Sequence, residues 1–195
     1  MTIPGSGNKI RAKIEKAFLA LVRLYTYHTP IAKGKYRLQA VAMRLCRILP
    51  KKIQVPTKDG RRLYANLATG METTLYFLGE YETVLTEKVA MLLREGDVCL
   101  DVGANFGWYT TLFYKHCGTN GAVHAFEPVP PIYDELCENY KLMGQPSNIL
   151  LNKLALGDSI QEMKVNLFSG LSTGHASLST QGRDDLESWL LSTNI

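Results

Sequence analysis

The sequence lacks a long apolar run and any clustered cysteine motif. Its first apolar stretch, Ala17–Val22, has six residues and is flanked by Lys16 and Arg23. A membrane-spanning helix needs about 20 apolar residues, and a signal peptide has a longer hydrophobic region with a cleavage site. The four cysteines form no CxxC pair and share no metal-like spacing with the four histidines. We therefore expect a cytoplasmic protein with reduced cysteines and no metal site.

Acidic residues are almost absent from the first quarter of the chain. Residues 1–52 contain 12 Lys and Arg but a single acid, Glu15, whereas residues 53–195 contain 10 basic and 17 acidic residues. We therefore divide the chain into a basic amphipathic helical segment, 1–52, and a second domain, 53–195. The basic residues are not interleaved with stacking aromatic residues, so we expect no nucleic-acid partner.

Helical periodicity within the basic segment leaves two interpretations open. Apolar residues recur on one side of a predicted helix, with Lys9, Lys13, Lys16 and Arg23 opposite; the apolar set is Ile10, Ile14, Ala17, Phe18, Leu21, Leu24 and Tyr25. The apolar side could pack on the main domain while the basic side stays in solvent. Alternatively, residues 9–25 could make peripheral contact with anionic lipid head groups or with an acidic polymer.

Strands and helices alternate beyond residue 53. The pattern predicts a hairpin over 53–66 and a mobile Ser/Thr/Gly-rich loop over 169–182. We further predict strands at 98–102, 122–126, 149–156 and 163–168, and helices around 38–49, 85–93, 108–117, 130–143 and 184–191. This order indicates an α/β fold with a Rossmann-like parallel sheet and flanking helices, which binds ligands at the carboxyl ends of its strands.

The chemistry is concentrated in the turn after the first strand of this sheet. Asp101 ends that strand, and Gly103 and Gly107 allow a tight turn and close approach to a ligand. The second strand ends at Glu127, whose carboxylate could bind a ribose diol. Trp108 replaces the third glycine of the dinucleotide fingerprint, which favours an adenosyl sulfonium cofactor over a nicotinamide dinucleotide. A purely structural turn with solvated carboxylates remains the other interpretation.

Four motifs in order resemble the FkbM-type S-adenosylmethionine-dependent methyltransferases, which have the Rossmann-like class I fold. They cover about residues 70–178 and read Gly79-Glu-Tyr-Glu82, Asp101-Val-Gly-Ala-Asn-Phe-Gly-Trp-Tyr-Thr110, Ala125-Phe-Glu-Pro128 and Leu154-Ala-Leu-Gly-Asp158. The resemblance implies an enzyme that transfers a methyl group from S-adenosyl-L-methionine to an oxygen, commonly a hydroxyl of a sugar or another metabolite.

The resemblance also implies roles for individual residues. Asp101, Gly103 and Asn105 would line the methionine part of the cofactor, Glu127 would bind its ribose, and residues 152–155 would face the adenine.

Three further residues complete the predicted site. Gly107 and Ala155 would belong to the cofactor-binding set, and Glu82 would be a further contact at the methionine end. No general base is assignable from the sequence. His175, in the predicted loop, is a candidate.

The resemblance stops before the strand that carries the family's acidic active-site pattern. Without that neighbour the apolar strand 98–102 becomes an exposed edge, which favours aggregation. We therefore expect a fragment of a longer protein, a truncated pseudo-enzyme, or a domain completed by another chain. The alternative function is a non-catalytic protein that binds the cofactor or a membrane surface and lacks the acceptor site.

Overall fold

The computed structural model describes residues 6–29, 33–46, 52–158, 161–168, 176–177 and 186–193. Its helices are α1 (Ser6–His28), α2 (Lys35–Leu45), α3 (Gly70–Leu78), α4 (Thr83–Leu92), α5 (Trp108–Cys117) and α6 (Pro130–Leu142). Its strands are β1 (Ile53–Pro56), β2 (Arg62–Ala65), β3 (Val98–Val102), β4 (Ala122–Phe126), β5 (Ile149–Asn152), β6 (Gln161–Phe168), β7 (Ala176–Ser177) and β8 (Leu186–Thr193). No helix in the described ranges is long and apolar enough to cross a membrane.

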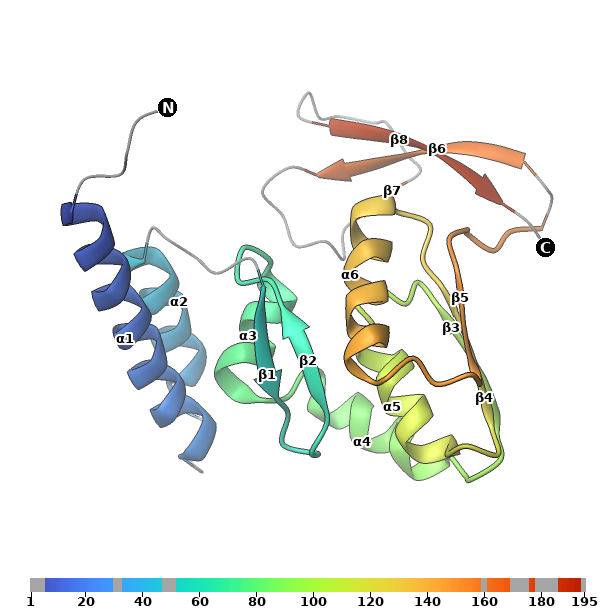
Figure 1. Cartoon of the computed structure of the whole chain (residues 1–195), viewed down its shortest axis with the longest axis horizontal. Coiled ribbons are helices and arrows are strands. Elements are labelled where there is room, and N and C mark those ends of the chain that lie inside the picture. Colours follow the sequence, from blue (N-terminus) through green and yellow to red (C-terminus); the bar gives the residue numbers. More distant parts are fainter. Residues whose placement is uncertain are drawn as a thin grey trace.

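A parallel sheet in the order β3-β4-β5 forms the centre of the second half of the chain. The register pairs Leu100 with His124 and His124 with Leu150, so the three strands run side by side with their carboxyl ends at one edge. Helices α5 and α6 lie on one face of the sheet (Figure 1). This arrangement confirms the predicted α/β class, and it places the ends of β3 and β4 next to the helix that follows each strand.

The other face of the parallel sheet exposes apolar side chains. Alternate residues of β3 are buried or exposed, and the exposed set, Val98, Leu100 and Val102, is 59–64% accessible. Leu150 of β5 is exposed on the same face, in line with Leu100. β3 pairs only with β4 among the described strands. The predicted exposure of the apolar strand is therefore present in the structure.

A buried amide on α6 is bonded to the β1–β2 hairpin. The side chain of Asn139 accepts a hydrogen bond from the Tyr64 backbone N–H at 2.6 Å and donates to the Phe106 carbonyl at 2.7 Å. The hairpin turn falls at Asp59-Gly60, as predicted, with Gly60 at φ +87°. Because Phe106 belongs to the turn after β3, this amide fixes the hairpin relative to the predicted site.

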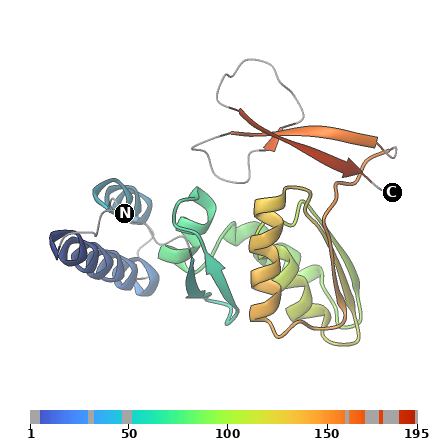
Figure 2. The same ribbon diagram turned by 45° about the horizontal axis from the view of Figure 1, so that its top comes forward.

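One apolar core joins the two amino-terminal helices to the hairpin and to α3. It includes Leu19 of α1, Ala42 of α2, Leu63 of β2 and Phe77 of α3. The Thr26 hydroxyl of α1 donates a hydrogen bond to the Phe77 carbonyl at 2.6 Å. The basic segment is therefore packed on the rest of the protein, at one end of the molecule (Figures 1 and 2).

Helix α1 does not pack through the apolar side that the first of the two interpretations places on the main domain. The residues it buries are Glu15, Leu19, Val22 and Thr26, whereas most of the predicted apolar face, including Ile14 and Leu21, is exposed. The sequence pattern did not indicate this face because it contains two polar residues. Thr26 can be buried because the Phe77 carbonyl accepts its hydroxyl group, and Glu15 can be buried because Arg11 pairs with it at 2.8 Å.

The carboxyl-terminal segment differs from the prediction in three respects. The third strand ends at Asn152 rather than at residue 156. The fourth predicted strand, β6, lies in a separate antiparallel sheet in the order β7-β6-β8 instead of extending the parallel sheet. The predicted helix over 184–191 is wrong, because Leu186–Thr193 pairs with β6 as a strand along its whole length, and this backbone pairing outweighs local helical preference.

One helix was missed by the sequence analysis, and one predicted loop is described only in part. Helix α3 was not predicted, although six of its nine residues are buried. Of the predicted loop 169–182, the structure describes only Ala176–Ser177, which pair with β6. The remaining residues of that loop lie outside the described ranges.

Candidate cofactor site

Asp101 is held at the end of β3 by the helix that follows it. Its carboxylate accepts a hydrogen bond from the Thr110 hydroxyl at 2.5 Å, and the residue is only 7% exposed. Burial raises the pKa of Asp101, and the hydrogen bonds from Thr110 act in the opposite direction. A carboxylate fixed in this way is oriented before any ligand arrives.

The turn after β3 is anchored to the end of β4 by backbone hydrogen bonds. The N–H groups of Gly103 and Ala104 both donate to the Phe126 carbonyl at 2.9 Å. Asn105 has a positive φ of +53°, and its side-chain oxygen accepts a hydrogen bond from the Phe106 N–H at 2.8 Å. This local bond stabilises a left-handed conformation that asparagine tolerates better than most residues. The turn is therefore well defined by its own contacts.

Glu127 joins the end of β4 to this turn. One of its carboxylate oxygens accepts the Asn105 N–H and the other accepts the Val129 N–H, each at 2.9 Å. The residue is 5% exposed, and burial raises the pKa of its carboxyl group, with the charge of Asp101 adding to that rise. The acid thus lies against the glycine turn and not in bulk solvent.

The two glycines of the turn have different surroundings. A Cβ on Gly103 would meet no atom within 4 Å, although its φ is +80°. A Cβ on Gly107, at φ +96°, would lie 2.8 Å from Leu136 Cδ1 of α6. Gly103 therefore leaves open space beside the turn, while Gly107 allows α6 to pack closely against the start of α5.

Glu82 approaches the same helix start from α4. Its carboxylate accepts a hydrogen bond from the Tyr109 hydroxyl at 2.7 Å, and Glu82 itself has a positive φ of +45°. Partial burial, together with this bond to an anion, raises the pKa of Tyr109 to about 12. The preceding residue, Trp108, donates its indole N–H to the Thr86 hydroxyl at 3.1 Å. The hydrogen bond from Tyr109 of α5 thus places Glu82 near the turn.

The remaining predicted residues are less closely tied to the turn. The Asn152 carbonyl accepts the Glu127 N–H at 3.0 Å, which brings the end of β5 to the same edge of the sheet. Ala155 follows three residues later. His175, the candidate base, lies outside the described residues. The described residues contain no group of three or more His, Cys, Asp or Glu side chains that could hold a metal ion.

Two supporting residues near the turn were not identified from the sequence. Arg61 of the hairpin stacks on the Trp108 ring at 4.1 Å and donates hydrogen bonds to the Trp108 carbonyl and the Thr111 hydroxyl. Met71 of α3 accepts a 3.9 Å hydrogen bond from the Asn105 side chain through its sulfur. Both contacts join residues far apart in the chain, so periodicity and spacing gave no signal for them.

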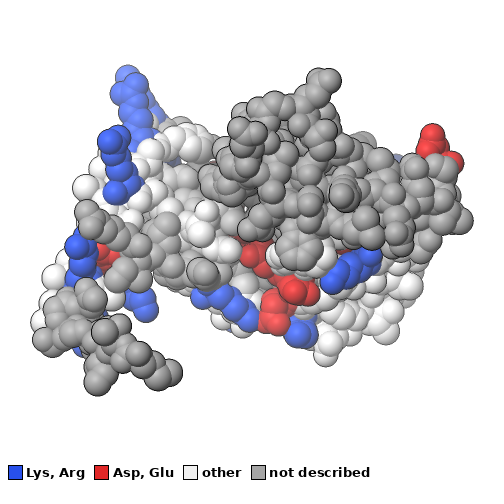
Figure 3. Space-filling model, turned by 90° about the horizontal axis from the view of Figure 1, so that it is seen from above, with Lys and Arg blue, Asp and Glu red and all other residues white. Residues whose placement is uncertain are grey.

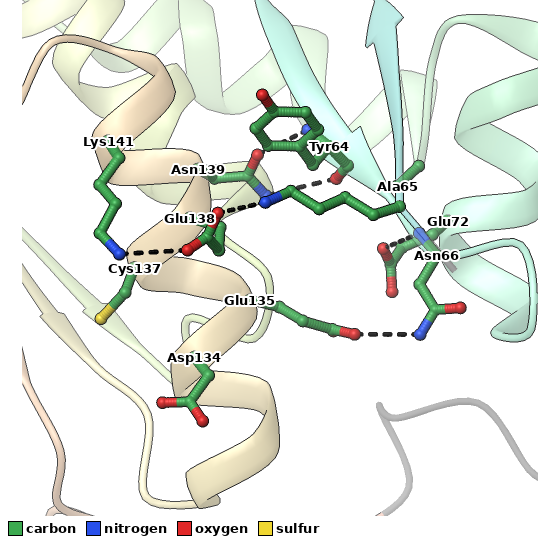
Figure 4. Close-up of a pocket in the computed structure, with 11 residues that line it drawn as sticks. Tyr64, Ala65, Asn66, Glu72, Asp134, Glu135, Cys137, Glu138, Asn139 and Lys141 are labelled. Atoms are coloured by element: carbon green, nitrogen blue, oxygen red, sulfur yellow. Dashed lines mark hydrogen bonds and ion pairs between the residues drawn. The ribbon is translucent and has the colours of Figure 1, made fainter. Parts of the chain in front are cut away.

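A separate acidic pocket of about 410 Å³ lies between the hairpin, α3 and α6 (Figure 4). None of the predicted cofactor residues lines it. Within it, Glu135 accepts a hydrogen bond from the Asn66 side chain at 3.0 Å, and Glu138 pairs with Lys52. Glu72 is almost fully buried, and burial, together with the charge of Glu135, raises its pKa to about 8. The surroundings of this carboxyl group therefore favour its protonated form.

A buried acid bonded to a glycine turn at the carboxyl edge of a parallel sheet fits the resemblance found in the sequence. Residues 101–192, just under half of the chain, match the family model of the methyltransferase FkbM domain. The match to this methyltransferase domain begins at Asp101, the first residue of the predicted glycine-turn motif. No curated protein matches the chain.

Solved structures with a similar arrangement include other methyltransferases. TYW2 from M. jannaschii, solved in complex with AdoMet, is 22% identical, with a TM-score of 0.41, over 52% of this chain and 42% of its own. A SAM-dependent O-methyltransferase from Thermotoga maritima is 14% identical, with a TM-score of 0.35, over 53% of this chain and 55% of its own. The chain thus spans about half of the length of each of these two proteins.

Proposed function

We propose that the chain binds S-adenosylmethionine at the carboxyl edge of β3, β4 and β5, and that the protein transfers the methyl group to a hydroxyl oxygen of a sugar or another metabolite. The FkbM domain supports methyl transfer. The observation that carries the cofactor assignment is the pair of 2.9 Å hydrogen bonds that hold the Glu127 carboxylate against the turn after β3. An acid at this position suits a ribose diol.

The residues present fit this cofactor. Each Glu127 oxygen accepts one backbone N–H, and an ionised carboxylate has about four acceptor positions, so two remain for ribose hydroxyls. The open space beside Gly103 allows a ligand to approach the backbone closely. Asp101 adds a negative charge that suits an ammonium group and a sulfonium, and that would repel a pyrophosphate.

The chain's own residues would bind and orient the cofactor, and they would form no covalent bond to it. When bound, S-adenosylmethionine supplies an electrophilic methyl group on a sulfonium. Glu127 would hold the ribose, Asp101 and Asn105 the methionine end, and residues 152–155 the adenine. The acceptor oxygen must lie about 3 Å from the methyl carbon, in line with the breaking bond, and its proton must pass to a base. His175 is our candidate for that base.

The role of Glu127 can be tested by calorimetry with S-adenosylhomocysteine and with its 2′,3′-dideoxy analogue. The wild-type chain should bind the diol-containing ligand about 10- to 100-fold more tightly than the analogue, because two charge-assisted hydrogen bonds are lost. Glu127→Gln should remove most of this preference, since the amide accepts weakly and presents a donor. The matched control is Glu95→Gln, an exposed glutamate that contacts Asn120.

Three results decide the proposal. A diol preference that is lost in Glu127→Gln and retained in Glu95→Gln supports it. Absence of S-adenosylhomocysteine binding by the folded wild-type chain would overturn the cofactor assignment. An equal diol preference in wild type and Glu127→Gln would be compatible with binding of the cofactor, but it would show that Glu127 does not bind the ribose.

A further inference from the structure

Helix α1 carries an exposed apolar stripe on the side that faces away from the protein. The stripe consists of Ile10, Ile14, Ala17, Leu21, Leu24 and Tyr25, and its five large members are 48–65% accessible. At about 100° per residue these side chains share one side of the helix. The buried residues Leu19, Val22 and Thr26 lie on the opposite side and contact α3 and the common core. The stripe is therefore additional to the apolar surface that folding uses.

Positive charge borders this stripe. Lys13 and Arg11 fall on its two flanks, and Lys13 and Lys16 are exposed. The single acid of the helix, Glu15, is buried and paired with Arg11 at 2.8 Å. Lys and Arg side chains stand out over the end of the molecule formed by α1 and α2 (Figure 3). The exposed surface of α1 is thus apolar along its middle and cationic along its edges.

The position of α1 leaves this surface accessible. It is the outermost helix in the views of Figures 1 and 2, on the far side of α3 from the parallel sheet. A flat surface could therefore meet the stripe along several helical turns without displacing the hairpin or α6. The predicted cofactor residues lie on other elements, so the stripe and that site do not compete for the same surface.

We propose that α1 is a membrane-surface helix that lies in the head-group region of a bilayer containing anionic lipid. Its apolar stripe would enter the boundary of the acyl chains, and the flanking Lys and Arg side chains would extend to lipid phosphates. A nucleic acid offers the phosphates but leaves the apolar stripe in water. A second copy would cover the stripe but would bring two cationic helices together. An anionic bilayer satisfies both the apolar and the cationic part of the surface.

The proposal is tested by sedimentation of the full chain with vesicles of phosphatidylcholine and phosphatidylserine in equal parts, and with pure phosphatidylcholine vesicles. We expect binding to the anionic vesicles that weakens as salt is raised. The double variant Ile14→Ser, Leu21→Ser should bind at least about tenfold more weakly, because two apolar side chains no longer leave water. The variant Lys13→Glu, Lys16→Glu should lose binding selectively on anionic vesicles.

The control is Leu92→Ser on α4, which removes an even more exposed apolar side chain outside the stripe and should bind like wild type. Circular dichroism and thermal unfolding verify that each variant is folded. Three outcomes overturn the proposal: no vesicle binding, binding that the serine variant leaves unchanged, or self-association through the stripe in place of vesicle binding. The measurement needs no cofactor, so its outcome is independent of the proposed methyl transfer.

Discussion

Gly103 and Gly107 share a positive φ but have different physical roles. Gly103 borders open space, so a side chain there would meet no protein atom. Gly107 faces Leu136, and a Cβ at 2.8 Å would force α6 or the turn to move. The sequence shows two similar glycines, and only the packing of α6 distinguishes them.

Substitution of each glycine by alanine should separate these roles. Gly107→Ala should lower the free energy of unfolding by about 2–4 kcal/mol, through steric overlap added to backbone strain. Gly103→Ala should cost only about 1 kcal/mol, from strain alone, and should weaken S-adenosylhomocysteine binding. Urea unfolding and calorimetry measure the two effects. Equal destabilisation by both substitutions would contradict this assignment.

Glu72 is a second residue whose behaviour depends on its surroundings. Its carboxyl group accepts the Asn66 N–H at 2.5 Å and the Thr69 hydroxyl at 2.8 Å, yet burial still dominates and raises the pKa from 4.5 to about 8. Between these two values the folded state retains a proton that the unfolded state releases. Its contribution to stability is therefore complete below pH 4.5 and is lost as the pH rises to about 8.

The variant Glu72→Gln should remove this pH dependence, because the amide resembles the protonated acid. The wild-type free energy of unfolding should fall by about 3–5 kcal/mol relative to the variant between the two pKa values. Urea unfolding across this pH range measures the difference, with Glu95→Gln as the exposed control. Parallel pH profiles for wild type and Glu72→Gln would show that Glu72 is ionised in the folded protein.

At the scale of elements, α6 holds the hairpin and the glycine turn together. Asn139 contacts both, through Tyr64 and Phe106, and it is 1% exposed. Arg61 makes a second connection from the hairpin to α5. The turn after β3 is therefore supported by elements that come before and after it in the chain, and its geometry depends on their packing.

Asn139→Ala should lower the free energy of unfolding by about 2–4 kcal/mol, since the half-buried Tyr64 N–H and the carbonyl of the buried Phe106 each lose this partner. Asn120→Ala is the control, because it removes a single exposed hydrogen bond to Glu95 and should change stability by less than about 0.5 kcal/mol. Urea unfolding measures both. A loss of less than about 1 kcal/mol in Asn139→Ala would show that the hairpin is held by other contacts.

At the scale of the whole molecule, the parallel sheet is covered unequally. Helices α5 and α6 pack on one face, whereas Leu100 and Leu150 remain exposed on the other (Figure 1). An exposed apolar face next to an unpaired strand edge is a recognised site for association.

Leu100→Thr should reduce this tendency at little cost. Because Leu100 is 59% exposed, the free energy of unfolding should change by less than about 1 kcal/mol. Binding of the dye ANS and the rate of aggregation should both fall. Leu92→Thr, which changes an exposed residue on α4, should have a smaller effect on both. Unchanged ANS binding in Leu100→Thr would show that this face is covered in solution.

Much of the local structure was predictable because it is encoded by neighbouring residues. The strand 98–102, the glycine turn, the helix opened by Pro130 and the acid at Glu127 all follow from short patterns. The sheet partner of β8 and the packed face of α1 did not follow. Each depends on a contact with a distant segment: β8 pairs with β6, and Thr26 of α1 bonds to the Phe77 carbonyl of α3.

The sequence by itself determined the alternation of strands and helices between residues 98 and 152, because turn chemistry and strand patterns are local; it also predicted the residues of the proposed cofactor site. The tertiary structure alone decided that the Glu127 carboxylate binds the Asn105 N–H, and that α1 leaves its apolar stripe exposed. The reason is physical: burial and hydrogen bonding between distant segments select one of several arrangements that the same local pattern allows.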